Sequence, residues 1–421
     1  MPNELKRVLA AAALIVLCLP PGAMASDGNG NRSDPPLRTA DLVAEAWRAI
    51  HENYFDQAFG GADWNSVGET YRKTEYASME EAHSAIRRML SHLSNPSTRF
   101  LTPAQGTAFF AEVGGDLGSG VGLMELLSVD VDEINGGIVI VTPVERTPAA
   151  QAGLRTGDRV LMVDGLSVAE LDLASLMSSL RGPPGSAVEM TVQRGDETRS
   201  VSITRERLAP VDAVTARALT VEGTRVAYLG LSLFTAAASE ELRAEIARMQ
   251  AEGPEAFVLD LRNNPGGSLA ALRTIAGAFL GEAPLARVAE RGGIRTLTAE
   301  GDRLIDKPLV VLINEGTASA AEVLASALRQ NERARLVGAH SFGKGLAHGY
   351  AALADGSGVL YTAGRIETLA GQDILTAGVA PDLAVDFAPH PVVTPTLEAA
   401  GPGDLQFAEA IRDIKRRSAP R

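Results

Sequence analysis

The spacing of apolar residues changes along the chain, and each change predicts a different kind of structure. Near the start, Val43, Ala46, Trp47 and Ile50 recur every three or four residues, which predicts amphipathic helices. Further on, short apolar runs such as 159–163 are separated by turn signals, which predicts strands. In the second half, strand-like runs alternate with helical spacing, which predicts an α/β layer architecture. The strands expected there are at residues 226–233, 257–261, 309–313 and 334–338.

These changes divide the 421 residues into several domains, as the length alone would suggest. We expect an α/β multidomain protein with an N-terminal helical region over 37–104 and a small β-rich domain over 105–207. An α/β core should occupy 208–390. The segment 391–421 should contain one more amphipathic helix near 404–415.

The first 25 residues have the three parts of a secretory signal peptide. Lys6 and Arg7 precede twelve apolar residues, and Ala23-Met24-Ala25 forms a cleavage site. Twelve residues are too few to span a bilayer, which needs about 20. Leu17 is too large for a lipoprotein signal at Cys18. We therefore expect a periplasmic or secreted protein with no membrane segment after cleavage, starting with a disordered leader over 26–36.

Composition removes several classes of function. Hydrophobic residues make up 45% of the chain, enough for a real core, so disorder throughout is excluded. With 52 acidic against 39 basic residues the net charge is −13, which disfavours nucleic-acid binding. The single cysteine cannot form an internal disulfide or a cysteine-based metal site. We expect no metal and no organic cofactor.

Ser319 is the first candidate for chemistry. It lies between a predicted buried strand and a predicted helix, where a hydroxyl is close to backbone N–H groups and the positive end of a helix dipole. This placement suits a nucleophile whose attack creates an oxyanion. The same position also suits a plain helix N-cap, the commonest role of serine there.

Two further segments also follow predicted strands. Gly266 and Gly267, at the end of the segment 260–267, can bring backbone N–H groups close to an oxyanion, although an ordinary turn would look the same. Lys344 lies between two glycines, which is unusual for a charge that is merely solvated.

Together the three segments resemble the C-terminal processing peptidases, a family of serine proteases with a Ser–Lys dyad. The matching stretches are Asp260–Gly267, Glu315–Glu322 and Ser341–Gly345, in the family's order, with the serine 25 residues before the lysine. The resemblance covers nearly all of the mature chain. The flanking stretches that also match are Glu45–Tyr54, Met89–Leu101 and Val379–Asp382. The last of these corresponds to a strand near the end of the family's core.

The resemblance implies a ClpP/crotonase-like protease core and assigns roles to residues. Ser319 would be the nucleophile and Lys344 its general base, with the oxyanion held by N–H groups of Gly266 or Gly267 and of Ala320. The middle region resembles a PDZ domain, which binds free C-termini of proteins and peptides. Its carboxylate-binding loop would be formed by Gly120, Val121, Gly122 and Leu123.

One position departs from the family. A glutamine usually follows the lysine by four residues as part of the catalytic set, and this chain has His348 instead. A neutral histidine can accept a hydrogen bond from the lysine, whereas a protonated one would repel it. His348 is therefore a working substitute, a sign of an altered enzyme, or a histidine without a role.

Two other functions remain open. The chain could be a catalytically silent PDZ adaptor that binds C-termini without cutting them, or a small-ester hydrolase using the same dyad. Substrates would be proteins or peptides with free C-termini in the leading interpretation. Helices beside a core also make a homo-oligomer possible.

Overall fold

The computed structural model describes most of the chain. The described residues are 38–95, 97–116, 118–123, 129–132, 137–140, 143–144, 147–155, 158–171, 173–385, 400–401 and 403–418. The predicted signal peptide (1–25) and leader (26–36) lie outside them. None of the described helices combines the length and apolar composition that crossing a bilayer requires.

Three helices form the N-terminal region: α2 (Thr39–Asn53), α3 (Trp64–Arg72) and α4 (Met79–Ser91), with a 3-10 turn η2 (Phe59–Gly61) between the first two. The predicted spacing is confirmed, since Val43, Ala46 and Ile50 are fully buried in one cluster. Capping residues start two of the helices: Asp63 accepts the N–H of Ser66, and Ser78 that of Glu81. After strand β1 (Arg99–Leu101), helix α5 (Pro103–Val113) begins at a capping box formed by Thr102 and Gln105.

The middle region is an antiparallel sheet with strand order β3-β4-β5-β7-β8, and β6 pairs with β5. Helix α7 lies over it, and Leu176, Met177 and Leu180 share a core with the strands. A separate pair, β2 with β9, closes the two ends of the region. The bounds are β2 Ser119–Gly120, β3 Val129–Asp132, β4 Gly137–Ile140, α6 Pro148–Gln151, β5 Arg159–Val163, β6 Leu166–Ser167, η3 Val168–Glu170, α7 Leu173–Leu180, β7 Ala187–Arg194, β8 Glu197–Thr204 and β9 Glu206–Arg207.

The second half contains a six-stranded sheet with order β10-β11-β12-β15-β16-β19, parallel except for β10. Side chains alternate between its faces. One face packs on α8, α9 and α10, and the other on α12, where Phe407 and Ile411 meet Tyr228 and Val258. The bounds are β10 Val214–Val221, β11 Thr224–Leu231, α8 Ala236–Ala251, β12 Ala256–Asp260, α9 Leu269–Leu280, β15 Leu309–Ile313, α10 Ala320–Gln330, β16 Arg335–Gly338, β19 Leu383–Ala384 and α12 Leu405–Ser418.

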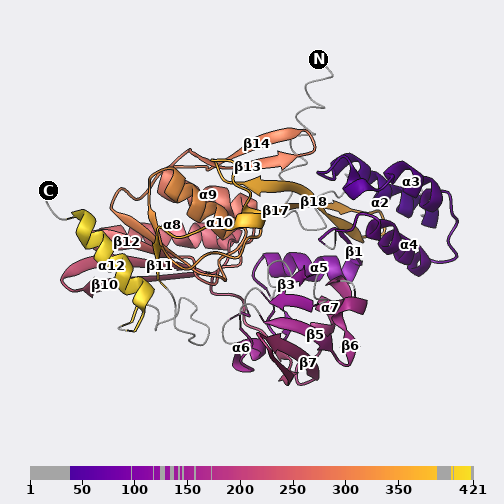
Figure 1. Ribbon diagram of the computed structural model, residues 1–421, viewed down its shortest axis with the longest axis horizontal. Helices are drawn as coiled ribbons and strands as arrows, with labels where there is room; N and C mark the ends of the chain where they lie inside the picture. Colours follow the sequence, from indigo (N-terminus) through magenta and orange to yellow (C-terminus); the bar gives the residue numbers. More distant parts are fainter. Residues whose placement is uncertain are drawn as a thin grey trace, which may run out of the picture.

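A second sheet, antiparallel, joins this core to the N-terminal helices (Figure 1). Its order is β1-β18-β13-β14, and β17 also pairs with β18. The pairing of Phe100 with Val359 ties the N-terminal region to strand β18 across most of the sequence. The bounds are β13 Pro284–Glu290, β14 Gly293–Thr298, β17 Leu346–Ala352, β18 Gly358–Glu367 and the short helix α11 Ile374–Ala377.

Two expectations need correction. The alternation of strands and helices beyond residue 208 is incomplete, because the antiparallel β13, β14, β17 and β18 interrupt it. The strand expected at Val379–Asp382 instead follows these residues as β19, paired in parallel with β16. Within the four residues, Val379 donates to and accepts from Ser341, and Pro381 has no N–H for a ladder.

Candidate active site

The three segments singled out in the sequence meet at one edge of the parallel sheet. Strands β12, β15 and β16 are neighbours in parallel register and end at Asp260, Ile313 and Gly338. The carboxyl ends of parallel strands lie at the same edge, so the loops that follow are brought together. The first two are tied by reciprocal bonds between the Asn263 and Asn314 side chains and backbone: Asn314 donates to Asn263 Oδ1, and Asn263 N–H donates to Asn314 Oδ1, both at 2.8 Å.

Ser319 has a strained backbone. It is the N-cap of α10, with φ 53° and ψ −118°, a region that residues other than glycine rarely adopt. Such a conformation costs about 1–3 kcal/mol and persists only where the surroundings enforce it. An ordinary N-cap has extended backbone and no need of this strain. Strain of this kind is concentrated at functional sites and favours a role beyond capping.

Glu322, one turn into α10, connects the serine to the lysine. Its side chain is fully buried. Oε2 accepts the backbone N–H groups of Ser319 and Lys344, each at 2.8 Å, so these two nitrogens lie at most twice that distance apart. Oε1 accepts the Ser341 hydroxyl at 2.5 Å and the Gly343 N–H at 2.7 Å. Burial raises the pKa of Glu322, and the hydrogen bonds act against that rise.

The loop that carries Lys344 is also fixed by its glycines. A Cβ on Gly345 would lie 2.5 Å from the backbone nitrogen of Leu375, and Gly343 has φ +94°. The Phe342 N–H donates to the carbonyl of Thr317, two residues before Ser319. Only small residues allow the loop this close to α10 and α11. Lys344 itself is half-buried.

The glycine pair lies directly against Ser319. A Cβ on Gly266 would be 2.8 Å from the Cβ of Ser319 and 2.9 Å from the backbone nitrogen of Ala320. The Gly266 N–H donates to Asn264 Oδ1 at 2.8 Å, so it is already engaged. Gly267, with φ +131°, is held by hydrogen bonds between its neighbours and Phe234. Ala320 is the first residue of α10, a position whose N–H has no partner inside the helix.

A buried ionic network stabilises the glycine loop, which is the segment 260–267 that contains Gly266 and Gly267. The Arg262 guanidinium, 1% exposed, bonds Asp260 and, through two nitrogens at 2.9 and 2.7 Å, Asp404. Tyr228 donates to Asp260 at 2.7 Å. Burial alone would lower the pKa of Arg262, but the two carboxylates outweigh it and raise that pKa well above its ordinary value. The network links the glycine loop to α12, which Asp404 caps by accepting the Phe407 N–H. Sequence reasoning missed it because Asp404 is 142 positions from Arg262.

His348 lies on β17, four residues after Lys344. Its Nδ1 is buried without a hydrogen-bond partner among the described residues. Burial, with a smaller effect of the positive charges of Lys344 and Arg99, lowers the pKa of His348 to about 3. The imidazole is therefore neutral at physiological pH, the form able to accept a hydrogen bond. His340, the histidine four residues before Lys344, is exposed.

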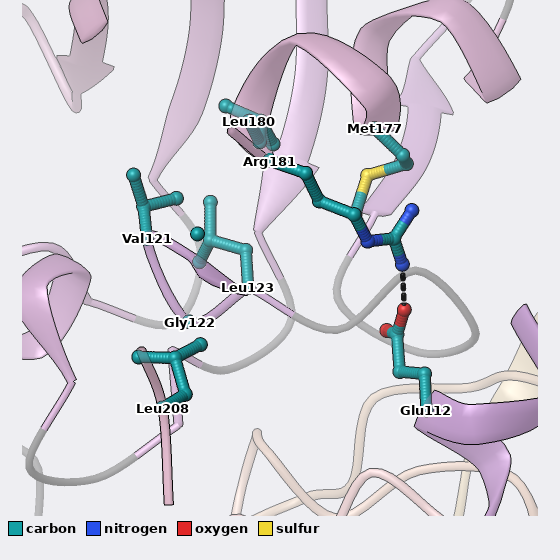
Figure 2. A pocket seen from close by; sticks show the side chains of 9 residues that line it. Glu112, Val121, Gly122, Leu123, Met177, Leu180, Arg181 and Leu208 are labelled. Carbon is teal, nitrogen blue, oxygen red and sulfur yellow. Dashed lines mark hydrogen bonds and ion pairs between the residues drawn. The ribbon is translucent and has the colours of Figure 1, made fainter. Parts of the chain in front are cut away.

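The predicted peptide-binding residues line a pocket of their own (Figure 2). Gly120, Val121, Gly122 and Leu123 form one wall; Met177 and Leu180 from α7, and Leu208, supply further apolar surface. A side chain on Gly122 would collide with Thr147, since its Cβ would lie 2.1 Å from that of Thr147. Arg181, which also lines the pocket, is paired with the buried Glu112 of α5. In the described part of the chain, no three His, Cys, Asp or Glu side chains are grouped as metal ligands.

Known proteins resemble the chain over most of its length. Residues 225–385 match the peptidase family S41, residues 125–204 a PDZ domain, and residues 43–74 the tricorn protease C1 domain. The carboxyl-terminal-processing protease of Picosynechococcus sp. is 36% identical over 352 residues, covering 83% of this chain and 84% of that protein. The chain belongs to peptidase family S41.

Other relatives agree with this assignment. The carboxyl-terminal-processing protease of Synechocystis sp. is 35% identical over 375 residues, covering 88% of this chain and 85% of that protein. Among solved structures, a photosystem II D1 C-terminal processing protease superposes with a TM-score of 0.74 at 34% identity, over 83% of this chain and 93% of that one. The S41 member described here is thus a serine peptidase with a PDZ domain. Proteins or peptides are its expected substrates.

Gly266→Ala should remove activity while leaving a folded peptidase. The new Cβ would meet Ser319 and Ala320 at a φ of +105°, so the serine or the glycine loop must move. A misplacement of about 1 Å can cost about 10²-fold in rate. Peptide cleavage and thermal melting would be measured together.

Gly253→Ala is the matched control. It has the same kind of positive φ, +66°, but its nearest neighbour would be an Arg225 side-chain nitrogen at 3.8 Å. Both variants should lose some stability, and only Gly266→Ala should lose cleavage. Equal activity of the two variants would contradict a functional contact between the glycine loop and Ser319.

Proposed function

We propose that this protein is a periplasmic or secreted endopeptidase that cleaves proteins near their C-termini with a Ser319–Lys344 dyad. The observation that carries the proposal is the shared oxygen of Glu322: backbone N–H groups of Ser319 and Lys344 both donate to it. The strained backbone of Ser319 adds to this support, because it presents the residue at a sharp strand-to-helix junction.

The chemistry follows from the roles of these two side chains. A lysine acts as a base only when its amine is neutral, and burial can lower a lysine pKa by as much as about 3–5 pH units. Lys344 takes the proton of the Ser319 hydroxyl as Oγ attacks the peptide carbonyl. The tetrahedral intermediate then expels the amine, which receives that proton, and water hydrolyses the acyl-enzyme.

The oxyanion is held by backbone N–H groups of Gly267 and Ala320. Of the two candidate glycines, Gly267 is the better donor, since the Gly266 N–H is engaged by Asn264. The role of Gly266 is then to allow close approach to Ser319. Losing one such donor typically costs about 2.7–4 kcal/mol of transition-state stabilisation.

His348 takes the place of the family's glutamine as a neutral hydrogen-bond acceptor that orients Lys344. Its lowered pKa supports this role, because a neutral imidazole does not repel the lysine. The PDZ domain supplies selectivity: the pocket formed by Gly120, Val121, Gly122 and Leu123 takes an apolar C-terminal residue and its carboxylate.

The remaining parts of the proposal concern organisation. We propose the division that the sequence predicts: a signal peptide over 1–25, a leader over 26–36, helices over 37–104, the PDZ domain over 105–207, a ClpP/crotonase-like core over 208–390 and a C-terminal segment over 391–421. No helix of the described residues could cross a membrane, and a homo-oligomer is compatible with the flanking helices.

Ser319→Ala and Lys344→Ala should each abolish cleavage of an unstructured protein, since an unactivated hydroxyl is a poor nucleophile. The double variant should lose little more than either single one, because the two residues act as a unit. Gel assays and intact-mass analysis of the products would measure this. A wild-type protein that binds C-termini but cuts nothing would identify a silent adaptor, and cleavage of nitrophenyl esters alone an esterase.

His348→Gln should keep activity, and its pH profile should match that of the wild type. With a pKa of about 3, His348 stays neutral between about pH 5 and pH 8 and adds no titration there. The ratio of the two kcat/KM values should therefore be constant across this range. If His348 titrated near its ordinary value, the wild type would fall below the variant as the pH decreases past about 6.5.

A peptide with a free apolar C-terminus should bind the Ser319→Ala protein more tightly than the same peptide with a C-terminal amide. The amide removes the negative charge that the loop N–H groups would meet. Calorimetry or fluorescence anisotropy gives both affinities. Equal affinities would show that the pocket does not capture a carboxylate.

A further inference from the structure

Glu322 does more than cap its own helix. Ser319 and Glu322 have the spacing of a capping box, in which the glutamate reaches back to the N-cap N–H. Three of its four donors, however, belong to a different loop: the Ser341 hydroxyl and the N–H groups of Gly343 and Lys344. A helix cap needs none of these three.

All four contacts suit an ionised carboxylate. Backbone N–H groups can only donate, and an ionised carboxylate accepts about four hydrogen bonds through its two oxygens. The Ser341 hydroxyl donates to Oε1, and the same hydroxyl oxygen accepts the Val379 N–H at 2.7 Å. Bonds from neutral donors to a buried charge are stronger than neutral ones, which makes this junction stiff.

The two oxygens have different neighbours. Oε2 holds the two backbone positions from which the proposed nucleophile and base extend, Ser319 and Lys344. Oε1 accepts hydrogen bonds from the part of the loop that precedes the lysine, at Ser341 and Gly343. One side chain thus sets the separation of two residues that are far apart in sequence.

We propose that Glu322 is a positioning residue of the peptidase, whose carboxylate keeps the backbones of Ser319 and Lys344 in register for proton transfer. This inference rests on the proposed dyad. Glu322 itself does not touch the substrate or exchange a proton in the reaction. Because proton transfer and attack need closely defined distances, a small relaxation of this junction lowers the rate of acylation.

Glu322→Gln is the informative variant, since glutamine has the same shape but a single acceptor oxygen. The amide nitrogen must face one of the two donor pairs, so at least one backbone N–H is left unpaired in a buried position. We expect kcat to fall by about 10- to 100-fold, while KM and the affinity of the PDZ domain for a C-terminal peptide stay within about twofold. Glu322→Ala should lower kcat further.

Asp413→Asn is the matched control for loss of a buried carboxylate. Asp413 lies on α12, across the sheet from the candidate site. It is 1% exposed and pairs with Arg335. This variant should lower the melting temperature without changing kcat. A fall in kcat at unchanged KM in Glu322→Gln, absent from Asp413→Asn, separates positioning from general stability.

Labelling by a fluorophosphonate probe keeps the two proposals apart. The wild type should react, Ser319→Ala and Lys344→Ala should not, and Glu322→Gln should react more slowly in proportion to its kcat. Labelling of Lys344→Ala at the wild-type rate would overturn the dyad. With the dyad intact, wild-type labelling and kcat in Glu322→Gln, or a change confined to KM and melting temperature, would overturn the role of Glu322.

Discussion

The parallel register of β12, β15 and β16 is the constraint on which the candidate site depends. It brings together loops that begin at Asp260, Ile313 and Gly338, although 78 positions separate the first from the last. Each strand is buried on both faces, by α8, α9 and α10 on one side and α12 on the other. The site is therefore built on rigid elements, and the loops need to set only the final positions of the candidate residues.

Buried charged side chains hold these loops in place. Burying an isolated ion is costly, and the two buried ions beside the candidate site, Glu322 and Arg262, both have matched partners. Glu322 gathers four donors from α10 and the Lys344 loop, and Arg262 is enclosed by Asp260 and Asp404. Removing one partner would leave the others unpaired, and so both networks resist rearrangement. One joins Ser319 to the loop that carries Lys344, and the other joins the glycine loop to the C-terminal helix.

The pocket lined by Gly120, Val121, Gly122 and Leu123 is connected to the rest of the molecule through neighbouring elements. Helix α5 follows β1, which pairs with β18, and β18 in turn pairs with β17, the strand that carries His348. Glu112 of α5 lies at the pocket and is paired with Arg181 (Figure 2). The pocket and the candidate catalytic loops are thus the two ends of one continuous set of packed strands and helices.

Local patterns in the sequence determined several helices and strands, the family and the candidate residues of this protein. Helical spacing predicted α2, apolar runs predicted β12, β15 and β16, and three motifs indicated the family and its candidate residues. These features depend on neighbours in the chain, so the sequence carries them directly. The S-x-x-E spacing at Ser319 and Glu322 was visible as well, but it indicates only a helix cap.

Tertiary structure decided what depends on distant residues. The pairing of β1 with β18, and the sheet that β13, β14 and β17 form with it, requires register between segments that no local pattern specifies. The three donors that make Glu322 a link between two loops come from residues about 20 positions away, and Arg262 finds Asp404 only in the folded chain. Whether His348 is charged was equally undecided, because the pKa of a histidine depends on how deeply the fold buries it.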